Sequence, residues 1–257
     1  LAGMLLAGPS DAVSNERLAA KPRLMRGGKL NPDFLSETAD YFAGHFYLRP
    51  ALLTANSTVQ AAVFRESASE DVVLGDGGWL FYADTLEDFQ GTNPMTGRAL
   101  FCAARNLALL QEYCAQQGTK FLFVCAPNKN TSYPEYMPGQ YRKTEQVSDL
   151  DRLEQALTQQ GVSFCDLREA LSGRESLTYY RTDSHWNGYG SYLAGRQILQ
   201  ALGKEADTED VSLSMQQHAG DLYGMLYPAS DRKEDAPAPA QLRTFSYLGD
   251  VRGADDQ

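Results

Sequence analysis

The chain has 257 residues, of which 43% are hydrophobic and 22% are charged, with a net charge of −10 and an isoelectric point near 4.8. This composition is typical of a globular protein and excludes collagen-like, coiled-coil and wholly disordered chains. The length suits one large α/β domain or two small ones. Because an acidic chain is repelled by phosphate backbones, we expect no nucleic-acid partner.

Residues 1–30 are predicted to form an N-terminal arm. The arm opens with LAGMLLAG, an apolar run of eight residues that is too short to cross a bilayer. The run fits either the end of a signal peptide or membrane anchor, or a loose apolar terminus. A membrane tether upstream of Leu1 is therefore one expectation, and residues 31–257 are expected to form a single domain.

Two helices and a hairpin are expected next. Asn31 is placed to cap the first helix, with Pro32 in its first turn, and the second helix follows Pro50. The runs DVVL and WLFY then flank Asp76-Gly77, a dipeptide that strongly favours a β-hairpin.

An alternation of helices and strands follows the hairpin. We expect, in chain order, helix 97–118, strand 119–127, helix 149–160 and strand 162–167. This order predicts a parallel sheet flanked by helices and joined by right-handed crossovers. Ligands bind such sheets beyond the carboxyl ends of the strands, where the loops after Pro127 and Asp166 lie.

The last part of the chain is less regular in pattern. A helix is expected from about Asn187 to Gly203, and the pattern weakens beyond residue 204. Residues 231–257 are predicted to be a flexible tail because SDRKEDAPAPAQ is polar and rich in proline and alanine. The four cysteines form no C-x-x-C pair, and buried free thiols are expected rather than disulfides.

The segment TYYRTDSHWNGYG holds the main candidate for a catalytic group. Asp183 and His185 lie two apart in a predicted loop, so the carboxylate can fix the tautomer of the imidazole locally. A histidine oriented in this way serves as a general base near neutral pH. Trp186 is expected to wall the site or to clamp the loop. In the structural alternative, Asp183 caps a turn and His185 packs.

The same segment resembles the signature of the DHHW proteins, a family related to the AlgJ and AlgX alginate O-acetyltransferases. That signature is a tyrosine, then Thr-Asp-x-His-Trp, then the glycine-containing start of a helix, as in YYRTDSHWNGYG. LGDGGWLFY, CAPNKNTSYPEYMP and HAGDLYGML resemble further parts of the family, so the resemblance spans about residues 14 to 230. It implies an SGNH-hydrolase-like (flavodoxin-like) α/β fold with a small β-hairpin, and leaves open whether the sheet is complete at the C-terminus.

The resemblance also implies a function. The protein would be an O-acetyltransferase or acetylesterase acting on a cell-surface or exported polysaccharide, from a secreted or membrane-anchored position. Asp183 would orient His185 as the general base of a Ser-His-Asp mechanism, without metal or cofactor. Substrate contacts would come from Asn128, Lys129, Tyr180 and Trp186. The acetyl donor is not indicated.

The serine that the resemblance implies is not found. In the family it follows the Asp-His motif by many tens of residues, in a turn after a strand. In YLGDVRG, Val251 stands at the corresponding position, and Ser246 lacks the glycine that such a turn needs. Either the chain is shortened relative to the family, or this member lacks the nucleophile.

Two other functions stay open. Asp183, His185, His218 and Asp221 offer ligands for zinc or manganese, although the spacing of a helical metal motif is missing. A non-catalytic glycan-binding or cell-envelope protein of the same fold would explain both the missing serine and the 14 tyrosines. No P-loop or G-x-G-x-x-G follows a strand, so a bound nucleotide has no support.

Overall fold

The computed structural model describes residues 18–204 and 211–240. Predictions that concern the apolar run at residues 1–8, Ser246 and Val251 lie outside the described residues. Among the residues described, no helix is both long enough and apolar enough to cross a membrane. All four cysteines are described and are free thiols, as predicted, but only Cys165 is buried, and Cys102 is exposed.

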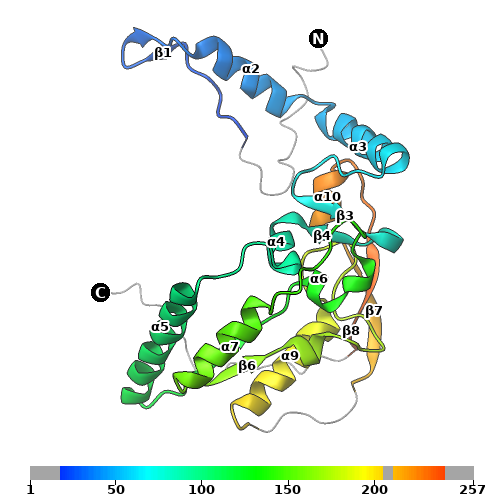
Figure 1. The fold of residues 1–257 in the computed structure, drawn as a ribbon. Helices are drawn as coiled ribbons and strands as arrows, with labels where there is room; N and C mark the ends of the chain where they lie inside the picture. Colours follow the sequence, from blue (N-terminus) through cyan, green and yellow to red (C-terminus); the bar gives the residue numbers. More distant parts are fainter. Residues whose placement is uncertain (1–17, 205–210, 241–257) are drawn as a thin grey trace.

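The centre of the fold is a short parallel strand pair between two layers of helices (Figure 1). Strand β5 (Phe123–Cys125) pairs with β6 (Phe164–Asp166), and the chain crosses between them through α7 (Asp149–Gln159). Helix α5 (Gly97–Gln116) packs against α7, and α9 (Gly188–Ala201) packs against β6. The predicted order of helices and parallel strands is confirmed, and the class is α/β.

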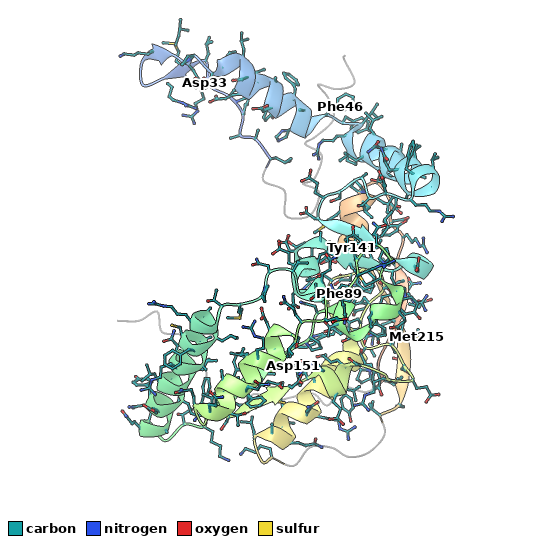
Figure 2. The ribbon with its side chains drawn as sticks, in the orientation of Figure 1. Asp33, Phe46, Phe89, Tyr141, Asp151 and Met215 are labelled. Carbon is teal, nitrogen blue, oxygen red and sulfur yellow. The ribbon has the colours of Figure 1, made fainter. Side chains whose placement is uncertain are left out.

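Alternate residues of the two strands face the two helical layers, as the pleat of a strand requires. Phe123 and Phe164 pack into a cluster with Leu157 of α7 and buried alanines of α5. Val124 and Cys165 point to the other side, into the largest core cluster, which includes Ala194 of α9. Figure 2 shows Phe89, also of this cluster, in the central part of the molecule.

Helix boundaries in this part of the chain follow the expected capping signals. Ser148 accepts a hydrogen bond from the amide of Asp151 at the start of α7, and Asn187 accepts one from the amide of Gly190 at the start of α9. Gly118 and Gly203 follow α5 and α9 with φ of 70° and 69°, in the left-handed region that favours glycine. Local chemistry therefore sets where these helices begin and end.

The predicted hairpin is confirmed. Strands β3 (Val72–Leu74) and β4 (Leu80–Tyr82) are antiparallel, with the 3-10 turn η2 (Asp76–Gly78) between them. Trp79 and Phe81 are buried in the main cluster, so the hairpin is anchored to the α/β body. The amide of Leu80 donates to the carbonyl of Arg181, 2.9 Å away, which ties the hairpin to the Asp-His segment.

The N-terminal part differs from the prediction in one boundary. Helix α2 (Phe34–His45) begins after Asp33 instead of after Asn31. Asn31 is buried, and its side-chain oxygen accepts from the amide of Asp33, so it forms a turn before the helix and does not cap it. The second predicted helix is α3 (Arg49–Val59), continued by the π-helical turn η1 (Gln60–Phe64). Before them, β1 (Met25–Arg26) pairs with β2 (Lys29–Leu30).

The predicted flexible tail is wrong for residues 234–239. Strand β7 (Leu213–His218) leads to α10 (Asp221–Leu226), and β8 (Glu234–Pro239) then pairs antiparallel with the whole of β7. Composition misled the prediction because prolines usually interrupt strands. Here Pro237 and Pro239 are two apart, so the backbone nitrogens that lack a hydrogen both point away from β7. The alternate residues of β8 can still pair with β7.

Short elements complete the described chain. They are η3 (Ala83–Thr85), α4 (Leu86–Gln90), α6 (Lys129–Ser132), η4 (Pro134–Tyr136) and α8 (Arg168–Leu171).

Candidate active site

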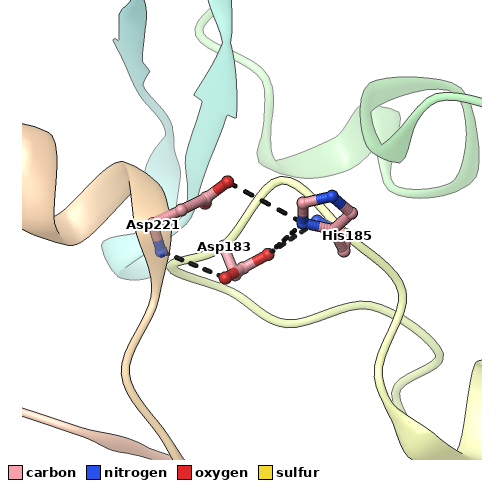
Figure 3. Close-up of side chains that lie close together, drawn as sticks. All are labelled: Asp183, His185 and Asp221. Atoms are coloured by element: carbon pink, nitrogen blue, oxygen red, sulfur yellow. Dashed lines mark hydrogen bonds and ion pairs between the residues drawn. The ribbon is translucent and has the colours of Figure 1, made fainter. Parts of the chain in front are cut away.

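Asp183 and His185 form the hydrogen-bonded pair that the sequence predicts (Figure 3). Nδ1 of His185 lies 2.8 Å from Oδ1 of Asp183. The Asp183 side chain is only 7% exposed and that of His185 is 75% exposed. The imidazole is thus held from inside through Nδ1, which fixes the proton there and leaves Nε2 as the basic nitrogen toward solvent.

The carboxylate of Asp183 accepts four hydrogen bonds. Oδ1 takes the backbone amide of His185 (2.9 Å) and Nδ1 of the same residue, and Oδ2 takes Nε2 of His218 (2.8 Å) and the amide of Asp221 (3.0 Å). Burial by itself raises the pKa of Asp183. The hydrogen bonds from His218, from the two amides and from the His185 ring outweigh burial and hold the pKa below its usual value, so Asp183 is ionised at neutral pH.

His218 is a member of this site whose role sequence reasoning missed. It ends β7, and its ring stacks on Tyr180 with centroids 3.8 Å apart and planes at 17°. Tyr180 was predicted to contact substrate, and the structure places it as the support of His218. The sequence named His218 only as a metal ligand, since nothing local shows that β7 returns to the Asp183 loop.

Asp221 adds a second carboxylate next to the imidazole, from the first turn of α10. Its Oδ2 lies 3.8 Å from Nδ1 of His185 and accepts the hydroxyl of Ser184 at 2.5 Å, and its Oδ1 accepts the Ser184 amide at 2.8 Å. The Ser184 hydroxyl is 3.2 Å from Nδ1 of His185, on the side already bound by Asp183. Ser184 therefore faces the wrong ring nitrogen to be activated as a nucleophile.

The same residues bear on the metal alternative. Ligand atoms of Asp183, His185 and Asp221 all lie within 4.8 Å of one another. The imidazole nitrogen that faces both carboxylates is the one that donates a proton to Asp183, and Nε2 of His218 likewise points at Asp183. A cation bound at this nitrogen would have to displace the proton that His185 donates to Asp183, so the hydrogen-bonded pair and a metal site are alternatives at the same atoms.

Lys129, which was predicted to contact substrate, points into the protein instead of into solvent. The residue is 5% exposed, and its ammonium donates to the carbonyls of Tyr180 (3.2 Å), Arg181 (3.1 Å) and Asp183 (2.6 Å). An ammonium has three N–H donors, so these three carbonyls use all of them. The side chain thus lies beneath the Asp183 loop and not in front of it.

Asn128 and Trp186 are placed by different parts of the fold. Asn128 precedes α6, donates to Asp88 at 3.0 Å, and lines a pocket of about 290 Å³ at the carboxyl end of β5. Neither Asp183 nor His185 lines that pocket, so the structure does not join Asn128 to the pair. Trp186 is partly buried against the main core cluster and bridges to Tyr179, which fits the predicted clamp better than a wall.

A groove of about 470 Å³ lies beside the Asp183 loop. Thr182, the residue before Asp183, is one wall, and the hairpin and α10 supply others. Aromatic and basic residues among its lining are Arg65, Trp79, Tyr223, Tyr227 and Arg232. Rings and guanidinium groups on a solvent-facing groove suit a polar ligand with apolar faces, such as a sugar.

Comparison with known families decides what kind of domain carries this site. The family model described as "SGNH hydrolase-like domain, acetyltransferase AlgX" matches residues 72–256, which is more than half of the chain. The chain belongs to the AlgX family of SGNH hydrolase-like domains. The match starts at β3 and includes the whole Asp183 site, while α2 and α3 precede it. The predicted resemblance to AlgJ and AlgX and the predicted SGNH-like α/β class are thereby confirmed.

This AlgX-family chain is also similar to individual proteins. It is 28% identical over 144 residues to the probable alginate O-acetylase AlgJ of Pseudomonas syringae pathovar tomato. The aligned region is 54% of this chain and 35% of that protein. The chain thus spans about a third of this relative's length. Similar solved structures include the O-acetyltransferase domain of Pseudomonas putida AlgJ (23% identity, TM-score 0.44, 65% of this chain and 63% of that one) and Pseudomonas aeruginosa AlgX (16% identity, TM-score 0.49, 66% and 44%).

Proposed function

We propose that this domain provides the general base of an O-acetyltransferase or acetylesterase that acts on an exported polysaccharide. The observation that supports this most directly is the Asp183–His185 pair, with a buried ionised carboxylate on Nδ1 and a solvent-exposed Nε2. Membership of the AlgX family supports acetyl transfer as the reaction class. The relative named as an alginate O-acetylase supports a polysaccharide as the acceptor or donor.

The proposed chemistry is acyl transfer through a serine ester. Nε2 of His185 removes the proton of a serine hydroxyl as that oxygen attacks the acetyl carbonyl. The resulting imidazolium returns its proton to the leaving oxygen, and Asp183 stabilises the positive charge. Water or a sugar hydroxyl, deprotonated by the same nitrogen, then attacks the acetyl-serine, and the serine oxygen leaves with the proton that the imidazolium returns. Attack by water gives hydrolysis, and attack by a sugar hydroxyl gives transfer. Among the described residues, no serine hydroxyl is bonded to Nε2, so the proposal requires a serine from the rest of the polypeptide.

The proposed location follows from the substrate. A polysaccharide that is acetylated during or after export is met outside the cytoplasm, so we propose an extracytoplasmic protein, secreted or held at the outer face of the membrane. The acidic net charge of −10 is compatible with this proposal and disfavours a nucleic-acid partner.

Replacing the general base is the first test. The full-length protein is expected to hydrolyse a chromogenic acetyl ester, and His185→Ala is expected to lower kcat/KM by about 10³-fold or more, because proton transfer at the nucleophile is lost. His45→Ala is the matched control, since His45 lies on α2 and contacts the carbonyl of Tyr41. Equal rates for His185→Ala and the unchanged protein would exclude His185 as the base.

A second candidate function is glycan binding without turnover, favoured by the groove beside Thr182. Tyr223 and Tyr227 both line it, with ring centroids 4.7 Å apart. If these rings stack on sugars, Tyr227→Ala should weaken binding of an acetylated polysaccharide about tenfold in titration calorimetry. Tyr113→Ala, an exposed tyrosine on α5, should leave the affinity unchanged. An unchanged affinity of Tyr227→Ala would mean that the glycan binds elsewhere on the protein.

A further inference from the structure

The segment that carries the pair is irregular, and this raises the question of what holds it still. Residues 180–185 belong to no helix or strand, although Asp183 and Ser184 are largely shielded from solvent. Backbone N–H and C=O groups in such a place must find partners, or the segment loses stability. The partners therefore show which residues fix the geometry of Asp183 and His185.

Lys129 supplies the partners for three carbonyls of this segment. Its ammonium donates to Tyr180, Arg181 and Asp183. The charge is buried over the rings of Trp79 and Phe81, at 5.7 and 5.2 Å from their centroids. Because the three acceptors come from nearly consecutive residues, one ammonium fixes the path of the backbone into Asp183.

Glu234 supplies the acceptors for backbone amides of the same segment. Its carboxylate accepts the amides of Arg181 and Thr182 at 2.8 Å each, and the hydroxyl of Thr182 at 2.5 Å. The segment thus lies between a cation that binds its carbonyls and an anion that binds its amides. Main-chain bonds from Leu80 to Arg181 and from Tyr223 to Thr182 complete this support.

We propose that Lys129 is a positioning residue of the Asp183–His185 pair, acting through the backbone of residues 180–183. The proposal deepens the proposed function and rests on it for the effect on turnover. Its structural part, the fixed orientation of the His185 ring, does not depend on which reaction the domain performs.

The protonation state of Lys129 makes this role sensitive to pH. Burial lowers the pKa of Lys129 to about 8, although the negative charges of Glu234 on β8, Asp183 in the loop and Asp221 on α10 raise it. At pH 7 the ammonium has three donors for three carbonyls. The neutral amine has two, so deprotonation above pH 8 leaves one carbonyl of the loop without its donor.

The test uses the histidine spectra of the full-length protein. The chain has three histidines, so long-range ¹H–¹⁵N spectra resolve the tautomer of each. In the unchanged protein at pH 7.5, His185 should carry its proton on Nδ1. In Lys129→Met we expect this tautomer preference to be lost, while His45 on α2 is unchanged, and turnover of an acetyl ester to fall about 10²-fold in kcat with little change in KM.

Lys120→Met is the matched control, because Lys120 donates to the single carbonyl of Leu202 on the surface. A folded Lys129→Met protein whose His185 spectrum matches that of the control would overturn the proposal. If Lys129→Met alters the His185 spectrum but even the unchanged protein does not turn over an acetyl ester, the positioning role stands and the proposed function is contradicted.

If Lys129→Met does not fold, the unchanged protein supplies the answer. Raising the pH from 7.5 to 9.5 should lower the Nδ1-protonated fraction of His185 with a midpoint near 8, while His45 keeps its spectrum. A His185 spectrum that stays constant through pH 9.5 would overturn the proposal.

Discussion

Replacing Asp183 by asparagine is expected to lower acetyl-ester turnover by about 10⁴-fold in kcat while leaving the protein folded. The side-chain amide of the variant keeps one acceptor oxygen. Its NH₂ group replaces the other oxygen, although both oxygens of the carboxylate accept hydrogen bonds. Either the His185 ring or the amide of Asp221 then loses its acceptor. The His185 ring is free to place its proton on Nε2, where it can no longer act as a base. Steady-state kinetics, with circular dichroism to confirm folding, measure this effect.

Asp221→Asn is the comparison for this variant. Asp221 lies 3.8 Å from Nδ1 of His185, against 2.8 Å for Asp183, so its loss is expected to cost about tenfold at most. Equal losses in the two variants would contradict the assigned orientation of the ring. Treatment with a chelator separates the metal alternative: activity that disappears and returns with zinc or manganese would favour a cation held by Asp183, His185 and Asp221.

Gly220→Ala is expected to destabilise the protein strongly, because the added methyl group would clash with the backbone of the Asp183 loop. A Cβ at Gly220 would lie 2.2 Å from the carbonyl oxygen of Thr182 and 2.5 Å from its carbonyl carbon. Glycine is required there by close packing, since its φ of −74° suits any residue. Because backbone atoms fixed by Tyr223 must move, we expect the free energy of unfolding to fall by about 3 kcal/mol.

Gly224→Ala controls for the loss of glycine itself. Gly224 lies in α10, the helix that Gly220 precedes, and an added Cβ there meets nothing within 4 Å. Alanine should raise the free energy of unfolding by about 0.5–1 kcal/mol, because it suits a helix better than glycine. Urea unfolding of both variants gives the comparison. Similar free energies of unfolding for the two variants would mean that the Thr182 carbonyl is free to move. That result would contradict a fixed loop around Asp183.

The sequence allowed prediction wherever the deciding interactions are local. Ser148 and Asn187 cap helices through bonds to residues three positions away, and Asp183 reaches His185 across one residue. The tail prediction failed because β8 is stable only when paired with β7, and composition carries no information about pairing. Lys129 was assigned to the substrate because its acceptors lie 51 to 54 residues further along the chain. No spacing rule reveals such a contact.

The partners of the Asp183 loop have a consequence for biosynthesis. Lys129 is made before the loop, but His218, Asp221 and Glu234 are made after it, the last of them 53 residues beyond Arg181. While the ribosome has yet to release β8, the amides of Arg181 and Thr182 lack their acceptor. Contacts over such separations form late, because the chain entropy of closing the intervening segment must be overcome first. His185 would therefore reach its final orientation only after most of the surrounding domain has already folded.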